Sequence, residues 1–202
     1  MAMDQHKILP LVGVLALQGD FMEHRHALEA CGAAVMEVRT PEDLSRVDAL
    51  ILPGGESTTI GKLLQWTGLA PELKARIEEG MPVYGTCAGA IVLAKTIVGR
   101  EQAPHLGVMD IEVERNAYGR QQDSFETALT VTLDGTETSV VAVFIRAPKI
   151  LWVGPSVNVL STLNGTIVMA REKNMLVSTF HPELTPGLEI HRYFIEQMIL
   201  TS

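Results

Sequence analysis

Short apolar runs alternate with segments of helical spacing in the first half of the chain. Residues 11–17 are almost continuously apolar, which is typical of a central strand covered on both faces. Strand–helix–strand units of the length seen here predict parallel pairing through right-handed crossovers. The same pattern predicts further strands at 33–38, 48–52 and 82–84, helices at 21–31, 57–67, 71–79 and 88–94, and a polar turn at 41–46.

From Gly107 onward the pattern changes to an alternation of apolar and polar residues, which is typical of antiparallel strands with one wet face. Asp134-Gly135 and Asn164-Gly165 predict tight turns. We therefore expect one α/β domain over residues 1–202, with residues 1–10 as an N-terminal extension. Its central, mostly parallel sheet is flanked by helices and extended by antiparallel strands. This half is predicted to contain strands at 111–115, 128–133, 140–145, 157–160, 166–170 and 175–179, and an amphipathic helix at 188–200.

The composition excludes several classes of function. With 202 residues, 47% of them hydrophobic, the chain can bury a sizeable core. A net charge of −8 and the lack of a basic run argue against a nucleic-acid partner. No apolar run is long enough for a membrane helix, and the N-terminus has no signal-peptide pattern, so we expect a cytoplasmic protein. Cys31 and Cys87 are then free thiols, and neither a metal nor a cofactor is expected.

Cys87 lies in the segment that points most directly to chemistry. A strand predicted at 82–84 leads to Gly85, Cys87 and Gly89, and a helix is predicted to begin at Ala88. A cysteine between two glycines at a strand-to-helix turn is typical of a nucleophile elbow, with the helix N-terminus favouring the reactive thiolate. The alternative is a small buried cysteine in a tight turn, and this segment alone does not decide between the two.

A second candidate is the loop at residues 53–57, Pro-Gly-Gly-Glu-Ser, which directly follows the strand predicted at 48–52. Because parallel strands end at one edge of a sheet, we expect this loop to lie beside Cys87. Paired glycines, Gly54 and Gly55, allow a backbone N–H to point into a site and form an oxyanion hole. The alternative is a plain turn before a helix with Ser57 as its N-cap, and both can hold together.

A third candidate is His181-Pro182-Glu183, which follows the apolar strand predicted at 175–179. In extended geometry residues two apart point to the same side, so the imidazole and the carboxylate would lie side by side. Such a pair suits a general base and the group that orients it, and together with Cys87 it favours a Cys–His–Glu triad. The other histidines lack the spacing of metal ligands, and His24 and His26 are expected on a solvated or interface face of the first helix.

The three segments, in this order, resemble class I (triad) glutamine amidotransferases, and the chain as a whole is similar to the glutaminase subunits of pyridoxal 5′-phosphate synthases. The resemblance covers nearly all of residues 12–194 and implies a sheet with a flavodoxin-like core. The residues that carry it are Gly85-Thr-Cys-Ala-Gly89, Pro53-Gly-Gly-Glu-Ser-Thr58, His181-Pro-Glu183, Gly13-Val-Leu-Ala-Leu-Gln-Gly19, Glu114-Arg-Asn-Ala-Tyr-Gly-Arg120, Asp123-Ser-Phe-Glu126 and Phe144-Ile-Arg-Ala-Pro148.

The resemblance implies a mechanism and a role for each site residue. Cys87 attacks the side-chain amide of L-glutamine, and a γ-glutamyl thioester forms as ammonia leaves. His181 transfers the proton, Glu183 orients the imidazole, and water then releases glutamate. Backbone N–H groups of Gly55 and Ala88 are expected to meet the oxyanion. The glutamine-binding positions implied by the family are Gly55, Glu56, Ser57, Arg115, Ile145 and Arg146.

The resemblance also implies a protein partner. A free glutaminase would waste glutamine, and the family passes ammonia through an internal tunnel to a docked synthase subunit, which activates the glutaminase. We expect the Gly54-Gly55 peptide to be the switch that responds to docking, and residues 18–24 to form part of the docking surface. The alternatives are a glutaminase subunit of another pathway, such as imidazole glycerol phosphate synthesis, and a non-catalytic assembly subunit.

Overall fold

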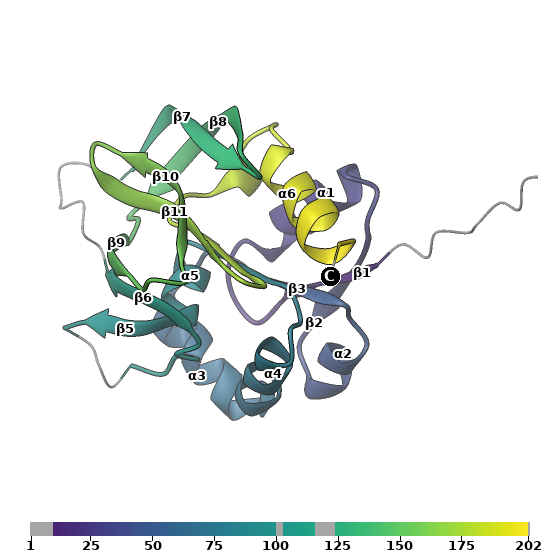
Figure 1. Ribbon diagram of the computed structural model, residues 1–202. Coiled ribbons are helices and arrows are strands. Elements are labelled where there is room, and N and C mark those ends of the chain that lie inside the picture. The colour runs from purple at the N-terminus through teal and green to yellow at the C-terminus, as the bar shows by residue number, and fades with distance from the viewer. Residues whose placement is uncertain (1–9, 100–102, 116–123, 202) are drawn as a thin grey trace, which may run out of the picture.

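A computed structural model describes residues 10–99, 103–115 and 124–201. Its core is a parallel sheet made of four strands from the first half, as predicted, and one at residues 175–178, which the sequence placed among the antiparallel strands (Figure 1). The register joins each strand to its neighbour in parallel, and the strands at 49–52, 83–86 and 175–178 are buried along their full length. In spatial order the five strands are β2 (Ala34–Val38), β1 (Leu11–Leu15), β3 (Ala49–Leu52), β4 (Val83–Thr86) and β12 (Met175–Ser178).

Helices cover both faces of this sheet and enclose two hydrophobic clusters (Figure 1). One face carries α1 (Phe21–Ala30) and α6 (Glu189–Tyr193), which pack with Tyr84 and Phe180. The buried runs of the strands therefore face apolar side chains on either side, which explains why they are almost continuously apolar. The opposite face carries α2 (Pro41–Ser45), α3 (Ser57–Trp66), α4 (Leu69–Glu78) and α5 (Ala88–Leu93).

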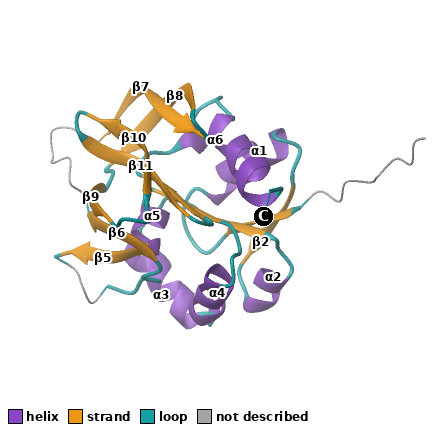
Figure 2. Ribbon diagram, in the orientation of Figure 1, coloured by secondary structure: helices purple, strands orange, loops and turns teal. Residues whose placement is uncertain are grey.

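The second half of the chain extends the sheet with mainly antiparallel strands, as predicted from its alternating pattern (Figure 2). A separate two-stranded sheet is formed by β7 (Ser124–Leu133) and β8 (Thr136–Ile145). Their turn at Asp134-Gly135 and the turn at Asn164-Gly165 have positive φ at both residues, and both turn predictions are confirmed. The added strands are β11 (Thr166–Glu172), β10 (Asn158–Leu163), β9 (Lys149–Val153), β6 (Met109–Glu114) and β5 (Ala94–Val98), of which β5 and β6 pair in parallel.

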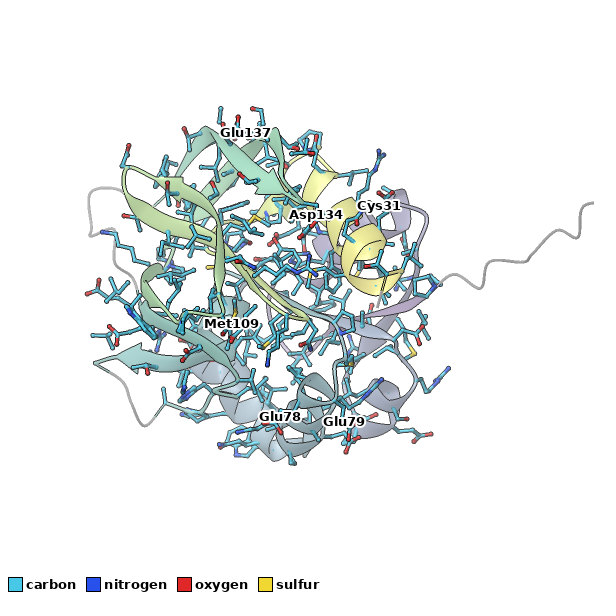
Figure 3. The ribbon with its side chains drawn as sticks, viewed as in Figure 1. Cys31, Glu78, Glu79, Met109, Asp134 and Glu137 are labelled. Carbon is cyan, nitrogen blue, oxygen red and sulfur yellow. The ribbon has the colours of Figure 1, made fainter. Side chains whose placement is uncertain are left out.

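Asp134 in the β7–β8 turn lies next to the C-terminal helix (Figure 3). The hydroxyl of Tyr193 on α6 donates to Asp134 Oδ1 over 3.4 Å and accepts from Arg171 Nη1 over 2.6 Å. These contacts join the two-stranded sheet, β11 and the end of the chain. The helix predicted at 188–200 is present but changes from α6 to a π-helical segment at Phe194–Ile199.

The prediction of a polar turn at 41–46 is wrong, because α2 occupies most of it. Thr40 Oγ1 accepts the Asp43 N–H, and Asp43 Oδ2 accepts the Thr40 N–H, which together form a capping box. Pro41 at the first helical position adds a fixed φ. Leu44 then buries its side chain completely. The polar composition reflects helix capping, which the sequence reading took for a turn.

Two strands were not predicted. The helix expected at 88–94 ends at Leu93, and β5 begins directly afterwards as the last strand of the sheet, with three of its five residues exposed. Strand β9 has no regular alternation of buried and exposed residues. None of the helices in the described part of the chain is long and apolar enough to cross a membrane. The extension expected at residues 1–10 lies, except for Pro10, outside the described residues.

Candidate active site

A cavity of about 360 Å³ opens at the edge of the sheet where the parallel strands end. The catalytic, oxyanion and glutamine-binding residues named from the sequence all line it, apart from Glu183, which lies behind His181. Gln18 and Asp20, in the turn after β1, were expected at this edge only as part of a docking surface, and they line the cavity as well. Ile91 was not predicted to lie here. The lining is formed by Gln18, Asp20, Gly55, Glu56, Ser57, Cys87, Ala88, Ile91, Arg115, Ile145, Arg146 and His181.

Cys87 lies between β4 and α5 with φ 47° and ψ −101°, a backbone conformation that non-glycine residues rarely adopt. Its N–H donates to the Ser178 carbonyl over 2.8 Å, which ties the elbow to β12. In a nucleophile elbow, small flanking residues are expected to let a substrate approach the cysteine. Instead they allow close packing, because a Cβ on Gly85 would lie 2.7 Å from the Gly89 carbonyl carbon, and one on Gly89 would lie 2.1 Å from the Leu52 oxygen.

His181 and Glu183 contact each other directly, with 2.7 Å between His181 Nδ1 and Glu183 Oε1. The expected cause, an extended backbone, is wrong, because Pro182–Leu184 form a 3-10 turn. The backbone N–H of His181 donates to the Val143 carbonyl over 2.8 Å, which ties the main chain at His181 to β8. The imidazole itself is oriented by its contact with Glu183.

The electrostatic environment favours a protonated His181. Burial favours the neutral imidazole, but hydrogen bonds to Asp20, Cys87 and Glu183, together with the charge of Glu183, outweigh it and raise the pKa of His181. Asp20 Oδ2 lies 3.4 Å from His181 Nδ1. Burial raises the pKa of Glu183, against the lowering effect of His181. The arrangement can hold a proton on the imidazole beside a cysteine sulfur, as nucleophilic catalysis by a thiolate requires.

The loop at residues 53–57 packs closely against the turn after β1. A Cβ on Gly54 would lie 2.3 Å from His181 Cε1, and one on Gly55, whose φ is +152°, would lie 2.6 Å from Gln18 Oε1. Gln18 Oε1 also accepts the Glu56 N–H over 2.7 Å. The N-cap of α3 is Glu56, whose carboxylate accepts the Thr59 N–H, so Ser57 is not the cap that the sequence suggested.

Arg115 lines the cavity, and its guanidinium contacts two residues of the segment at 56–58. Its Nη2 lies 2.7 Å from Glu56 Oε1, and its Nη1 donates to Thr58 Oγ1 over 2.8 Å. The side chain is only 16% exposed, although the alternating pattern of this strand would also suit a solvated arginine. Arg146, which also lines the cavity, is exposed and has a backbone φ of 43°. The carbonyl oxygen of its neighbour Ile145 lies 4.0 Å from Cys87 Sγ.

One group of metal-ligating side chains occurs in the described ranges, formed by Asp20, His181 and Glu183, whose ligand atoms lie within 4.8 Å of one another. Both carboxylates face the same nitrogen, His181 Nδ1, at 3.4 and 2.7 Å. A single N–H at Nδ1, directed at Glu183 Oε1, accounts for the shorter of the two contacts.

The expectation that His24 lies on a solvated or interface face is wrong, and so is its inclusion in a docking surface at 18–24. Its side chain is completely buried between α1, α6 and β4, where it contacts His191 and Thr86. His26, two residues further along α1, is exposed as expected. The period of a helix separates residues two apart by about 200°, so the two histidines lie on opposite faces.

Comparisons with known proteins agree with the resemblance seen in the sequence. The model of the SNO glutamine amidotransferase family matches residues 14–200. The pyridoxal 5′-phosphate synthase subunit PdxT of Carboxydothermus hydrogenoformans is 57% identical over 93% of this chain and 97% of its own. The same subunit of Pelotomaculum thermopropionicum is 54% identical over 93% and 95%. A crystal structure described as a glutamine amidotransferase is 52% identical, with a TM-score of 0.87 over 92% of this chain and 97% of that one.

Proposed function

The chain belongs to the SNO glutamine amidotransferase family, and from this premise we propose that it is the glutaminase subunit of a pyridoxal 5′-phosphate synthase. It hydrolyses L-glutamine to L-glutamate and ammonia, and the ammonia passes to a synthase subunit that makes pyridoxal 5′-phosphate. The observation that carries this function is the cavity in which the Cys87 elbow faces His181, itself bonded to the buried carboxylate of Glu183.

Cys87 is the nucleophile, His181 the general acid and base, and Glu183 the group that orients His181. The Cys87 thiolate attacks the side-chain carbonyl carbon of glutamine, and His181 protonates the amide nitrogen, which leaves as ammonia. The resulting γ-glutamyl thioester is cleaved by water, whose proton His181 accepts. Glutamate leaves and the thiolate is restored. The raised pKa of His181 supports an imidazolium before attack.

The oxyanion that forms at the substrate carbonyl requires two donors near Cys87 Sγ. We assign the backbone N–H groups of Gly55 and Ala88, because both residues line the cavity next to Cys87. Gly55 has a φ that favours glycine and packs against Gln18 Oε1, so this loop is held in a conformation that a small rearrangement can change. We infer that the Gly54-Gly55 peptide turns when the synthase subunit docks.

Glutamine recognition is assigned to the remaining cavity residues. Arg115 and Arg146 carry the forked donors that suit the substrate α-carboxylate, and Glu56 offers an acceptor for the α-ammonium. Arg115 and Glu56 already hold each other at 2.7 Å, so the pair is arranged before substrate arrives. Ser57 and Ile145 complete the binding set. We place the protein in the cytosol, where a reducing environment keeps Cys31 and Cys87 as free thiols.

The test measures glutamate release with and without a synthase subunit. Cys87→Ala should abolish release under both conditions, whereas Cys31→Ala, which changes a half-buried cysteine outside the cavity, should leave it intact. A glutamine-analogue electrophile should alkylate the wild type and Cys31→Ala once each, and should not alkylate Cys87→Ala. Glutamate release that survives in Cys87→Ala would refute the assigned nucleophile.

A further inference from the structure

A chain of buried polar side chains lies directly behind the Glu183 carboxylate. His24 on α1 and His191 on α6 are both completely buried, and 3.0 Å separates His24 Nδ1 from His191 Nε2. His24 Nε2 lies 3.0 Å from Thr86 Oγ1 on β4 and 3.3 Å from Glu183 Oε2. The mechanism above uses none of these three side chains, of which only His24 contacts Glu183. Buried imidazoles in an otherwise apolar cluster require an explanation, because burying a polar group is costly unless it is well partnered.

The neighbours of the two imidazoles determine which nitrogen carries each proton. If His24 carried its proton on Nδ1, its Nε2 lone pair would face the Glu183 carboxylate at 3.3 Å. His191 would then have to place its own proton on Nδ1, a buried atom with no hydrogen-bond partner in the described structure. With protons on Nε2 of both rings, His191 donates to His24, and the His24 N–H faces Thr86 and Glu183. The second arrangement avoids a buried unpaired N–H and a lone pair against a carboxylate.

The second carboxylate oxygen of Glu183, Oε2, would be stabilised by an N–H group nearby. The side chain has no solvent exposure, Oε1 is taken by His181 Nδ1, and Oε2 has no regular hydrogen-bond partner among the described residues. The nearest ring nitrogen facing it is His24 Nε2, at 3.3 Å. A carboxylate that is buried with one bare oxygen is driven toward protonation, and the direction of the Glu183 pKa shift agrees.

We propose that His24 is a positioning residue for Glu183, with its Nε2–H bonded to Thr86 Oγ1 and lying 3.3 Å from Oε2, and with its tautomer fixed by His191. The inference rests on the proposed function, since it assigns Glu183 the role of orienting His181. The positive end of the His24 N–H dipole, 3.3 Å from Oε2, favours the ionised carboxylate against the effect of burial, and favours the orientation in which Oε1 meets His181 Nδ1. Through that contact it maintains the imidazole in the tautomer that faces Cys87 with Nε2.

His24 acts as a fixed dipole that does not titrate with the active site. Burial lowers its pKa well below the usual value, and the nearby rings of His191 and His181 lower it further. The titratable groups that face it are His191 from α6, Glu183 from the 3-10 turn and Tyr84 from β4, whose ring is 6.4 Å from that of His24. Removing its N–H should therefore change the protonation of Glu183 without removing a charge.

Two amide substitutions test the roles of the two ring nitrogens of His24 one at a time. His24→Gln places an N–H as many bonds from the backbone as Nε2, whereas His24→Asn replaces only Nδ1, keeping an acceptor for His191. We expect His24→Asn to lower kcat for glutamine roughly 10- to 100-fold at neutral pH with KM nearly unchanged, as for loss of a hydrogen bond to a charged group. The acidic limb of its pH profile should move to higher pH by about one unit. His24→Gln should restore both quantities to within about threefold of wild type.

The measurements are made on the complex with its synthase subunit. If Cys87→Ala behaves as proposed but His24→Asn and His24→Gln have equal kcat and equal pH profiles, the positioning role is wrong and the glutaminase assignment stands. If Cys87→Ala retains turnover, the proposed function itself fails. Histidine ¹⁵N chemical shifts of the unmodified protein test the tautomers without any variant. Protons on Nε2 of both His24 and His191 are expected, and a proton on His24 Nδ1 would overturn the proposal.

Discussion

Adding one methyl group to the elbow, in Gly89→Ala, should impair activity well beyond its effect on stability. Gly89 lies two residues after Cys87, in the first turn of α5, and packs against the backbone of β3. A Cβ at this position would lie 2.1 Å from the Leu52 carbonyl oxygen and 2.9 Å from its carbonyl carbon. These are main-chain atoms of a fully buried central strand, so they cannot rotate away as a side chain would.

The structure sets the size of the effect. Real Cβ atoms essentially never approach a heavy atom closer than 3.0 Å, so α5 and β3 must separate by about 0.9 Å. Cys87, at the start of α5, moves with the helix relative to His181. A displacement of about 1 Å at reacting groups costs roughly 100-fold in rate. Overpacking of a buried contact costs roughly 1–3 kcal/mol, which lowers Tm by about 2–12 °C in a chain of this length.

Glutamate release by the complex and thermal unfolding of the isolated chain measure the two effects. Gly187→Ala is the matched control, because its nearest contact is the flexible tip of the Glu189 side chain at 2.6 Å and its φ is outside the left-handed region. We expect the control to resemble wild type in kcat and Tm. If Gly89→Ala also keeps wild-type kcat and Tm, the close contact of α5 with β3 does not position Cys87, and the reasoning fails.

Three further predictions concern the cavity wall, the C-terminal helix and pH. Arg115→Ala leaves Glu56 without its partner, and KM for glutamine should rise at least tenfold; an unchanged KM would exclude Arg115 from substrate binding. Tyr193→Phe removes the acceptor of the Arg171 N–H and should lower the free energy of unfolding by about 1 kcal/mol in urea titrations, with kcat unaffected; equal stability would show that this contact contributes nothing. Burial lowers the pKa of His191 to about 4. Between about pH 6.5 and pH 4 the unfolded state therefore binds more protons than the folded state. As the pH is lowered through this range, the His191 side chain should reduce the free energy of unfolding by about 1.4 kcal/mol per pH unit. His191→Gln should remove that part of the slope between pH 7 and 5, and equal slopes in both proteins would contradict the burial argument.

Local sequence patterns were sufficient for the class of fold and for the segments around the cavity. Apolar runs at 11–15 and 49–52 indicate buried strands because a strand covered on both faces has no polar side. Asn164-Gly165 specifies its turn because both residues tolerate positive φ. The rule that parallel strands end at one edge then brings the loop at 53–57 to Cys87. The structure has these elements in the expected places.

The wrong predictions concerned local backbone conformation and an exposed edge strand. The capping box of α2 resembled a polar turn, and the backbone after His181 bends into a 3-10 turn where an extended strand was expected. Edge strand β5 was not predicted because three of its five residues are exposed, so it lacks the strong apolar signal of a central strand.

The elbow motif, the order of the three segments and the parallel core can be read from this sequence, because each is determined by residues within a few positions of one another. The residues that surround the Glu183 carboxylate cannot be predicted from the sequence in this way. His24 and His191 are 167 positions apart and meet only because α1 and α6 pack on the same face of the sheet. Helical spacing shows that His24 and His26 differ in direction, but which of them is buried depends on the helix that packs against α1. Contacts of this kind are fixed by sheet order and helix packing, and tertiary structure alone decides them.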